Sequence, residues 1–186
     1  GTGGRTMESL VNAGFIKGVL DLTTTEWCDE IVGGVLAAGP DRCSAAALNG
    51  VPAVVSVGAD DMVNFGPWDT VPEQYKSRNL YKHNPTVTLM RTTEEENQKI
   101  GEAIAGKVNM SIGPCAVMLP LKGVSMIDAE GQPFYGPKED AALFGAIKDT
   151  VDPDKADVIE LDAHINDDEF AIAAAQKLID LMTQKD

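Results

Sequence analysis

Residues Val51–Pro67, VPAVVSVGADDMVNFGP, carry the clearest signal of the fold class. Its apolar, mostly β-branched opening predicts a buried strand of a parallel sheet. Small, polar and acidic residues follow at once, and ligands of open α/β sheets bind beyond the carboxyl ends of the strands. We therefore predict a ligand loop, with a solvated connection between two elements as the alternative. The residues expected to contribute are Gly58, Asp60, Asp61 and Asn64.

Strand-like runs alternate with helical patterns on both sides of this stretch. The expected strands are 16–22, 51–57, 86–90, 115–121 and 158–161. The clearest helix start is Thr92 or Thr93 as an N-cap, with Glu94 to Glu96 in the first turn. This alternation predicts a single α/β domain, Rossmann-like and three-layered, with a mostly parallel sheet.

The N-terminal segment is rich in glycine. We predict that GTGGR forms a loop leading into a helix near Thr6, where backbone N–H groups and the helix dipole favour an anion. The full GxGxxG pattern is absent because Thr6 takes its last position, and a flexible terminus is the alternative. Such a loop normally follows a strand, so we expect the first strand of the domain to lie upstream. The candidate ligand residues are Gly1, Thr2, Gly3, Gly4 and Arg5.

Two more loops follow predicted strands. Thr23, Thr24 and Thr25 end the 16–22 strand, and Asp162 and Asn166 follow the 158–161 strand. Helix capping explains these residues as well as ligand contact does. Because the carboxyl ends of parallel strands share one edge of the sheet, we expect all four loops to line one cleft.

Composition excludes several classes of protein. The chain has 186 residues, enough for one sizeable core, and a net charge of −14, which argues against binding duplex nucleic acid. No apolar run approaches the ~20 residues of a membrane span. The cysteines, Cys28, Cys43 and Cys115, are odd in number and lack zinc-ligand spacing, so we expect a reducing cytoplasm.

Several long motifs resemble one family. GTGGR, VLDLTTTE, GPDR, VVSVGADDMVNFGP, YKHNP with TLMRTT, and DAHINDDEFA occur in this order. This order resembles the C-terminal half of the tomato-mosaic-virus resistance protein family, whose bacterial and fungal relatives have a Tm-one-like ATP-binding domain. The resemblance runs from residue 1 to about 182. It implies two α/β subdomains, of which this chain is the second, and nucleotide binding. In the plant protein it also implies binding to a viral replication protein, and it assigns no residue to ATP.

Three functions remain open. The first is binding of ATP or another phosphorylated small molecule, with Mg²⁺ accompanying the nucleotide; no Walker A sequence occurs. The second is an enzyme acting on a small carboxylate or phosphoester, with Asp60, Asp61, His83 or His164 as acid or base. The third is an interaction module that uses residues 68–86, an aromatic and basic segment. The expected partners are the upstream half of the same protein and a second copy of the chain.

Overall fold

Four parallel strands form the central sheet. A computed structural model describes residues 2–183 and places the strands in the order β1-β2-β6-β7. Each neighbouring pair is parallel, as predicted. Their bounds are Val19–Thr23 for β1, Ala53–Gly58 for β2, Cys115–Pro120 for β6 and Asp157–Leu161 for β7.

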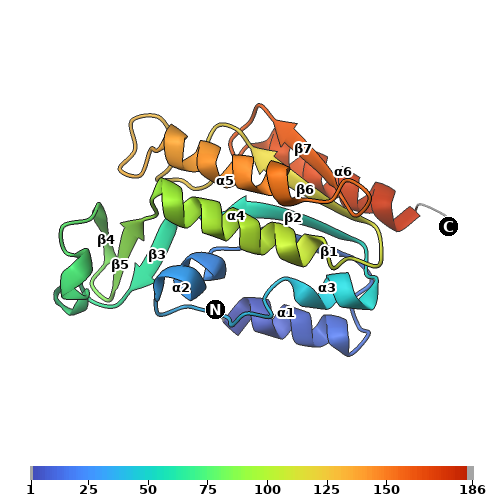
Figure 1. Cartoon of the computed structure of the whole chain (residues 1–186), viewed down its shortest axis with the longest axis horizontal. Helices are drawn as coiled ribbons and strands as arrows, with labels where there is room; N and C mark the ends of the chain where they lie inside the picture. Colours follow the sequence, from blue (N-terminus) through green and yellow to red (C-terminus); the bar gives the residue numbers. More distant parts are fainter. Residues whose placement is uncertain (1, 184–186) are drawn as a thin grey trace.

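Helices cover both faces of this sheet, which confirms the three-layer α/β class (Figure 1). Along β2, Val55 and Val57 pack with the larger group of helices, whereas Val54 packs against the last helix. All six residues of β2 are buried because both of its faces are covered. The larger group consists of α1 (Thr2–Asn12), α2 (Glu26–Val32), α3 (Ser44–Asn49), α4 (Glu94–Val108) and α5 (Pro137–Thr150), and the last helix is α6 (Asp168–Thr183).

A second, antiparallel sheet corrects one prediction. The strand expected at 86–90 is β5 (Val87–Arg91), and it pairs with β3 (Met62–Phe65) and β4 (Leu80–Asn84) instead of joining the parallel sheet. A tight connection between β4 and β5 makes this local pairing available. Figure 1 shows the three strands at one end of the molecule. Residues 68–86 therefore contain β4 and two short 3-10 turns, Trp68–Thr70 and Glu73–Tyr75.

The glycine-rich N-terminus is helical, which corrects a second prediction. Helix α1 begins at Thr2 rather than near Thr6, so Gly3 and Gly4 lie inside it; Gly1 lies outside the described residues. Glycine disfavours a helix by about 1 kcal/mol, but close packing decides here. A Cβ on Gly4 would lie 2.6 Å from Arg42 Nε and 2.7 Å from Glu26 Oε1. Only glycine lets this helix approach so closely.

The start of α4 confirms a prediction from local sequence. Thr93 is the N-cap, its hydroxyl accepts from Glu96 N over 3.2 Å, and the Glu96 carboxylate accepts from Thr93 N over 2.8 Å. This reciprocal capping box depends on residues three apart, so no tertiary contact is needed to predict it.

Candidate functional site

Two adjacent depressions lie where β1, β2 and β6 end. The first, which we call the edge pocket, has a volume of about 310 Å³, and the second, the α1 groove, about 450 Å³. They share Leu22 and Thr23 at the end of β1. The edge pocket is lined by Leu22, Thr23, Gly58, Ala59, Val124, Ser125, Met126, Ile165 and Asn166. The α1 groove is lined by Gly3, Gly4, Met7, Leu20, Asp21, Leu22, Thr23, Thr25, Glu26 and Arg42.

The structure brings part of the predicted ligand set to these depressions. Thr23, Gly58 and Asn166 line the edge pocket. Gly3, Gly4 and Thr25, together with Thr23, line the α1 groove. Residues from four predicted loops therefore meet across two neighbouring depressions rather than in one cleft.

Two residues of the N-terminal segment point elsewhere. Thr2 is exposed and lines neither depression. Arg5 is also exposed, and its Nε donates to the backbone oxygen of Ala38 over 2.9 Å. The guanidinium is thus held by a neighbouring loop, away from the positions where we expected it to meet an anion.

Four other predicted ligand residues are buried. Asn64 lies in β3, where its backbone N–H donates to Asp29 Oδ1 over 2.7 Å. The Thr24 hydroxyl lies 2.8 Å from Ser56 O and 2.9 Å from Asp60 Oδ2. Thr24, Asp60 and Asp61 are each 0% exposed, so none of these side chains meets solvent in this structure.

The adjacent aspartates Asp60 and Asp61 differ in environment. Burial raises the pKa of Asp60 well above its usual value, and the charge of Asp61 raises it further. Thr24 has one hydroxyl proton and two acceptors, so a protonated Asp60 completes the pair by donating to Thr24. Asp61 Oδ2 instead accepts from Ser125 Oγ over 2.7 Å. Burial raises the pKa of Asp61 to about 6, which leaves it mostly ionised at neutral pH.

The remaining predicted residues lie on or near the surface. Asp162 is exposed, and its carboxylate lies 3.0 Å from Lys122 Nζ. His83 is exposed in β4, which belongs to the antiparallel sheet and not to the parallel one. His164 Nε2 lies 2.9 Å from the backbone oxygen of Ser125, and its Nδ1 accepts from Asn166 N over 3.1 Å. Because Nδ1 is an acceptor, Nε2 carries the proton and donates to Ser125 O.

An arginine that lies between two acids lines the α1 groove. Arg42 is 3% exposed and contacts Asp21 twice, through Nη1–Oδ2 at 2.5 Å and Nη2–Oδ1 at 2.8 Å. Its Nε lies 3.3 Å from Glu26 Oε2. Desolvation by burial lowers the pKa of Arg42, but Asp21 and its other neighbours raise it by more, so the guanidinium stays charged. We call Asp21, Glu26 and Arg42 the Arg42 cluster.

A second arginine lies between acids beyond β6. Arg91 Nη2 donates to Asp140 Oδ1 over 2.7 Å and lies 3.5 Å from Asp128 Oδ1. Burial, together with the charge of Asp128, raises the pKa of Asp140 to about 7. We call Arg91, Asp128 and Asp140 the Arg91 cluster. It borders a third depression of about 460 Å³, lined by Leu121, Lys122, Gly123, Glu130, Tyr135, Pro137, Asp140, Ala141 and Phe144.

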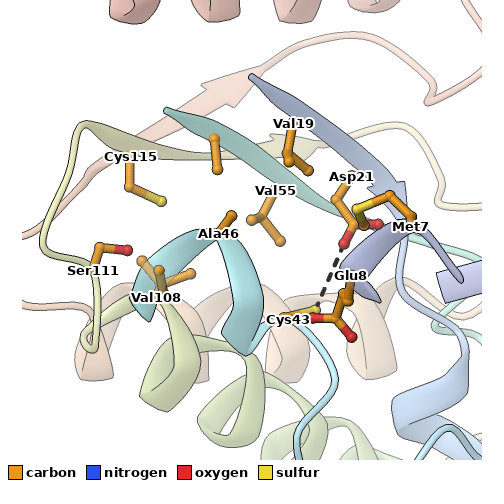
Figure 2. Close-up of a pocket in the computed structure, with 12 residues that line it drawn as sticks. Met7, Glu8, Val19, Asp21, Cys43, Ala46, Val55, Val108, Ser111 and Cys115 are labelled. Carbon is orange, nitrogen blue, oxygen red and sulfur yellow. Dashed lines mark hydrogen bonds between the residues drawn. The ribbon is translucent and has the colours of Figure 1, made fainter. Parts of the chain in front are cut away.

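A fourth cavity lies under α1 and α3, away from the carboxyl edge (Figure 2). Cys43, Cys115 and Glu8 face it with apolar side chains from the sheet. Its free volume is about 20 Å³, roughly the space of one water. Burial raises the pKa of the Cys43 and Cys115 thiols, so neither is a reactive thiolate. This cavity is a packing defect rather than a ligand site.

Two further classes of site receive no support from residues 2–183. No group of three or more His, Cys, Asp or Glu side chains there could hold a metal ion. None of the helices in this range is long and apolar enough to cross a membrane.

Sequence reasoning missed Ser125, Arg42, Arg91 and Asp140. A local signal existed for Ser125, because Gly123-Val124-Ser125 begins the G-x-S-x-G pattern of nucleophile turns. No local signal existed for the Arg91 cluster, since Arg91 and Asp140 are 49 residues apart in the chain.

Comparison with known proteins identifies relatives along almost the whole chain. Residues 1–182 match the model of the "Uncharacterised protein family (UPF0261) C-terminal domain". A UPF0261 protein of Clostridium tetani is 62% identical over 182 residues, covering 98% of this chain and 45% of the relative. A UPF0261 protein of Rhizobium meliloti is 52% identical, covering 97% of this chain and 46% of the relative. The tomato "ToMV resistance protein Tm-1(GCR237)" is 45% identical over 182 residues, which cover 97% of this chain and 24% of the relative. The chain thus spans about half the length of its bacterial relatives.

Proposed function

This chain belongs to the uncharacterised protein family UPF0261, and we propose that the carboxyl edge of its sheet binds a nucleotide or another phosphorylated small molecule. The observation that carries the proposal is the pair of adjoining depressions at this edge, which share Leu22 and Thr23. Their volumes, about 310 and 450 Å³, fall in the range of small-molecule sites. The edge is also the place where open α/β sheets hold their ligands.

The α1 groove is the better place for the phosphate. Its wall includes Gly3 and Gly4 in the first turn of α1, a turn that contains no acidic residue. The first N–H groups of a helix have no partner within the helix and bear partial positive charge. A Cβ added to Gly3 would meet nothing within 4 Å, so the backbone there is open to a ligand. In this arrangement the uncharged part of the ligand occupies the edge pocket.

In this proposal Mg²⁺ binds as a complex with the nucleotide and not at a separate site in the protein. The acids of the α1 groove, Asp21 and Glu26, already face Arg42. Together with the lack of a metal-binding cluster within residues 2–183, this favours coordination by phosphate oxygens and water.

The experiment is calorimetric titration of the chain with ATP, ADP, AMP and inorganic triphosphate. Gly3→Val adds bulk where the phosphate would approach, and we expect it to weaken binding at least ten-fold. Gly106→Val is the matched control, because Gly106 is an exposed glycine of α4 that also has nothing within 4 Å of its added Cβ. Both substitutions should leave the circular dichroism spectrum nearly unchanged.

Two results would contradict a phosphate site in the α1 groove. If the Clostridium tetani relative, which is about twice as long, binds a nucleotide and this chain does not, the phosphate site lies in the part of the relative that the chain does not span. Equal weakening by Gly3→Val and Gly106→Val would also remove the α1 groove from consideration.

One observation favours an interaction function as well. The β4–β5 hairpin presents Lys82, His83 and Asn84 as exposed residues, and Trp68 in the same segment is 47% exposed. These exposed charged and aromatic side chains on one segment make protein binding the second candidate. The tomato relative is named a resistance protein against ToMV. Exchanging Lys82 and His83 for serine and comparing the capture of a candidate partner by immobilised protein would test it, with nucleotide titration as the control.

A further inference from the structure

The edge pocket contains a serine whose hydroxyl is held by a buried carboxylate. Ser125 Oγ donates to Asp61 Oδ2 over 2.7 Å, and the serine is only 8% exposed. Asp61 is 0% exposed and lies directly behind it. We propose that Ser125 is a nucleophile, that Asp61 is its general base, and that the edge pocket is a hydrolase site for a small neutral acyl ester. The proposal goes beyond nucleotide binding and does not require it.

The turn that presents Ser125 is possible only with glycine. Gly123 has φ +128°, and a Cβ on it would lie 1.9 Å from Asp128 O and 2.8 Å from His164 Cδ2. The turn follows β6, a central strand, so it brings the serine to the middle of the sheet edge. A strand-to-glycine-to-serine order is the first part of a nucleophile turn. The chain departs from the full pattern, because Ile127 stands at the second glycine position and no helix follows immediately.

Neighbouring loops hold the serine in place. Ala59 N donates to Val124 O over 2.8 Å, and Ala59 has φ +58°, a backbone conformation that costs energy for a residue with a side chain. His164 Nε2 donates to Ser125 O over 2.9 Å. Ile127 N donates to Ser125 Oγ over 3.2 Å, which leaves the hydroxyl proton directed at Asp61. Such fixation of a hydroxyl is what positioned nucleophiles need.

The environment of Asp61 suits a base. Its Oδ1 is buried and has no hydrogen-bond partner among the described residues. Burial and the charge of Asp128 raise its pKa to about 6, whereas the Ser125 hydroxyl and the charge of Arg91 oppose the rise. A carboxylate with a pKa near the working pH is an effective proton acceptor. Asp60, the adjacent acid, has its pKa raised well above the usual value by burial and cannot take this role.

The lining of the edge pocket selects a neutral substrate. Its side chains are those of Leu22, Thr23, Ala59, Val124, Ser125, Met126, Ile165 and Asn166, with no lysine, arginine or histidine. Phosphoryl transfer needs cations around the transferred group, so a phosphoester does not fit beside the charge of Asp61. An ester carbonyl carries no net charge and fits the apolar contacts. The volume of about 310 Å³ limits the substrate to a small acyl group and its alcohol.

The reaction requires only the ester and water. Ser125 Oγ forms a bond to the carbonyl carbon while its proton moves to Asp61 Oδ2. The tetrahedral intermediate expels the alcohol, which leaves with the proton from Asp61, and an acyl-serine remains. Water then adds to the acyl carbon and gives one proton to Asp61. Collapse releases the carboxylic acid and returns that proton to Ser125 Oγ.

The test uses two neutral probes on the full chain. We expect phenylmethanesulfonyl fluoride to form an adduct on Ser125, located by peptide mass spectrometry, and p-nitrophenyl acetate to be hydrolysed above the buffer rate. Ser125→Ala and Asp61→Asn should each reduce hydrolysis at least 100-fold. Ser111→Ala is the matched control, because Ser111 is also buried (6% exposed) but lines the cavity under α1 and α3, and it should keep full activity. The rate should rise with pH through one ionisation near 6.

Hydrolysis that persists in Ser125→Ala would overturn the proposal. So would the absence of a Ser125 adduct in the unsubstituted protein, an outcome that depends on no variant being folded. Melting curves identify a variant that fails to fold, and the labelling result then decides. These outcomes are distinct from those of the nucleotide titration, because Gly3 does not line the edge pocket.

Discussion

The Arg42 cluster and the Arg91 cluster contain the same kinds of side chain but pair them differently. Both contain a nearly buried arginine, 3% and 6% exposed, between two acids. Arg42 donates to Asp21 through two of its nitrogens. Arg91 donates to four different residues, namely to Phe134 O, Gly136 O, Thr92 Oγ1 and Asp140 Oδ1. In the second cluster, burial and the charge of Asp128 raise the pKa of Asp140 to about 7. The same kinds of side chain therefore form a concentrated ion pair at Arg42 and a distributed set of hydrogen bonds at Arg91.

The largest expected effect comes from removing Arg42. Arg42→Met should lower the free energy of unfolding by about 3–5 kcal/mol at pH 7, because it leaves the buried Asp21 carboxyl without its ion-pair partner. Arg91→Met should cost less, about 2 kcal/mol, since Asp140 can take up a proton and Asp128 keeps the N–H groups of Val124 and Gly136. Urea denaturation measures the two losses of unfolding free energy, provided that the m-values of the variants are unchanged. Equal losses of unfolding free energy in the two variants would contradict the difference that we infer between the two clusters.

The next effect is a pH dependence that belongs to Asp140. Its pKa is raised to about 7 in the fold, against an unfolded value of about 4, so the folded state binds the extra proton. Stability is therefore greatest below pH 4 for this group and falls as pH rises to 7, by about 4 kcal/mol. Asp61, with its pKa raised to about 6, adds a smaller loss in the same direction.

Asp140→Asn should flatten this decline between pH 5 and 8, measured as unfolding free energy at each pH. Arg91 and Asp128 lie against Asp140, and Lys122, Glu130 and Tyr135 line the same depression. Asp149→Asn, at an exposed position of the same helix α5, is the matched control and should retain the decline. A decline that is identical in both variants would assign the titration to another group.

The smallest effect should come from the exposed ion pair Lys122–Asp162. Its side chains are 55% and 82% exposed, and water screens charges in such a position. Asp162→Ala should change the unfolding free energy by no more than about 0.5 kcal/mol, again by urea denaturation. A loss comparable to that of Arg42→Met would mean that Asp162 has a structural role that its exposure does not suggest.

The layers of the fold and its local capping signals could be predicted from the amino-acid sequence. Alternating strand and helix patterns predicted β1, β2, β6 and β7 with their helices. The signal is strongest for β2 and β6, whose residues are all buried, because burial on both faces requires continuous apolar runs. The capping box at Thr93 and Glu96 was equally predictable, since its two partners are three residues apart.

Long-range packing set several features that local sequence propensity does not predict. It made Gly3 and Gly4 helical, because α1 packs against Arg42, and it moved β5 into a separate antiparallel sheet. It also buried Asp60 and Asp61, which the sequence suggested were ligand residues, and set Ser125 against Asp61 from 64 residues away. Local patterns act over a few residues, whereas desolvation and long-range pairing depend on which segments the fold brings together.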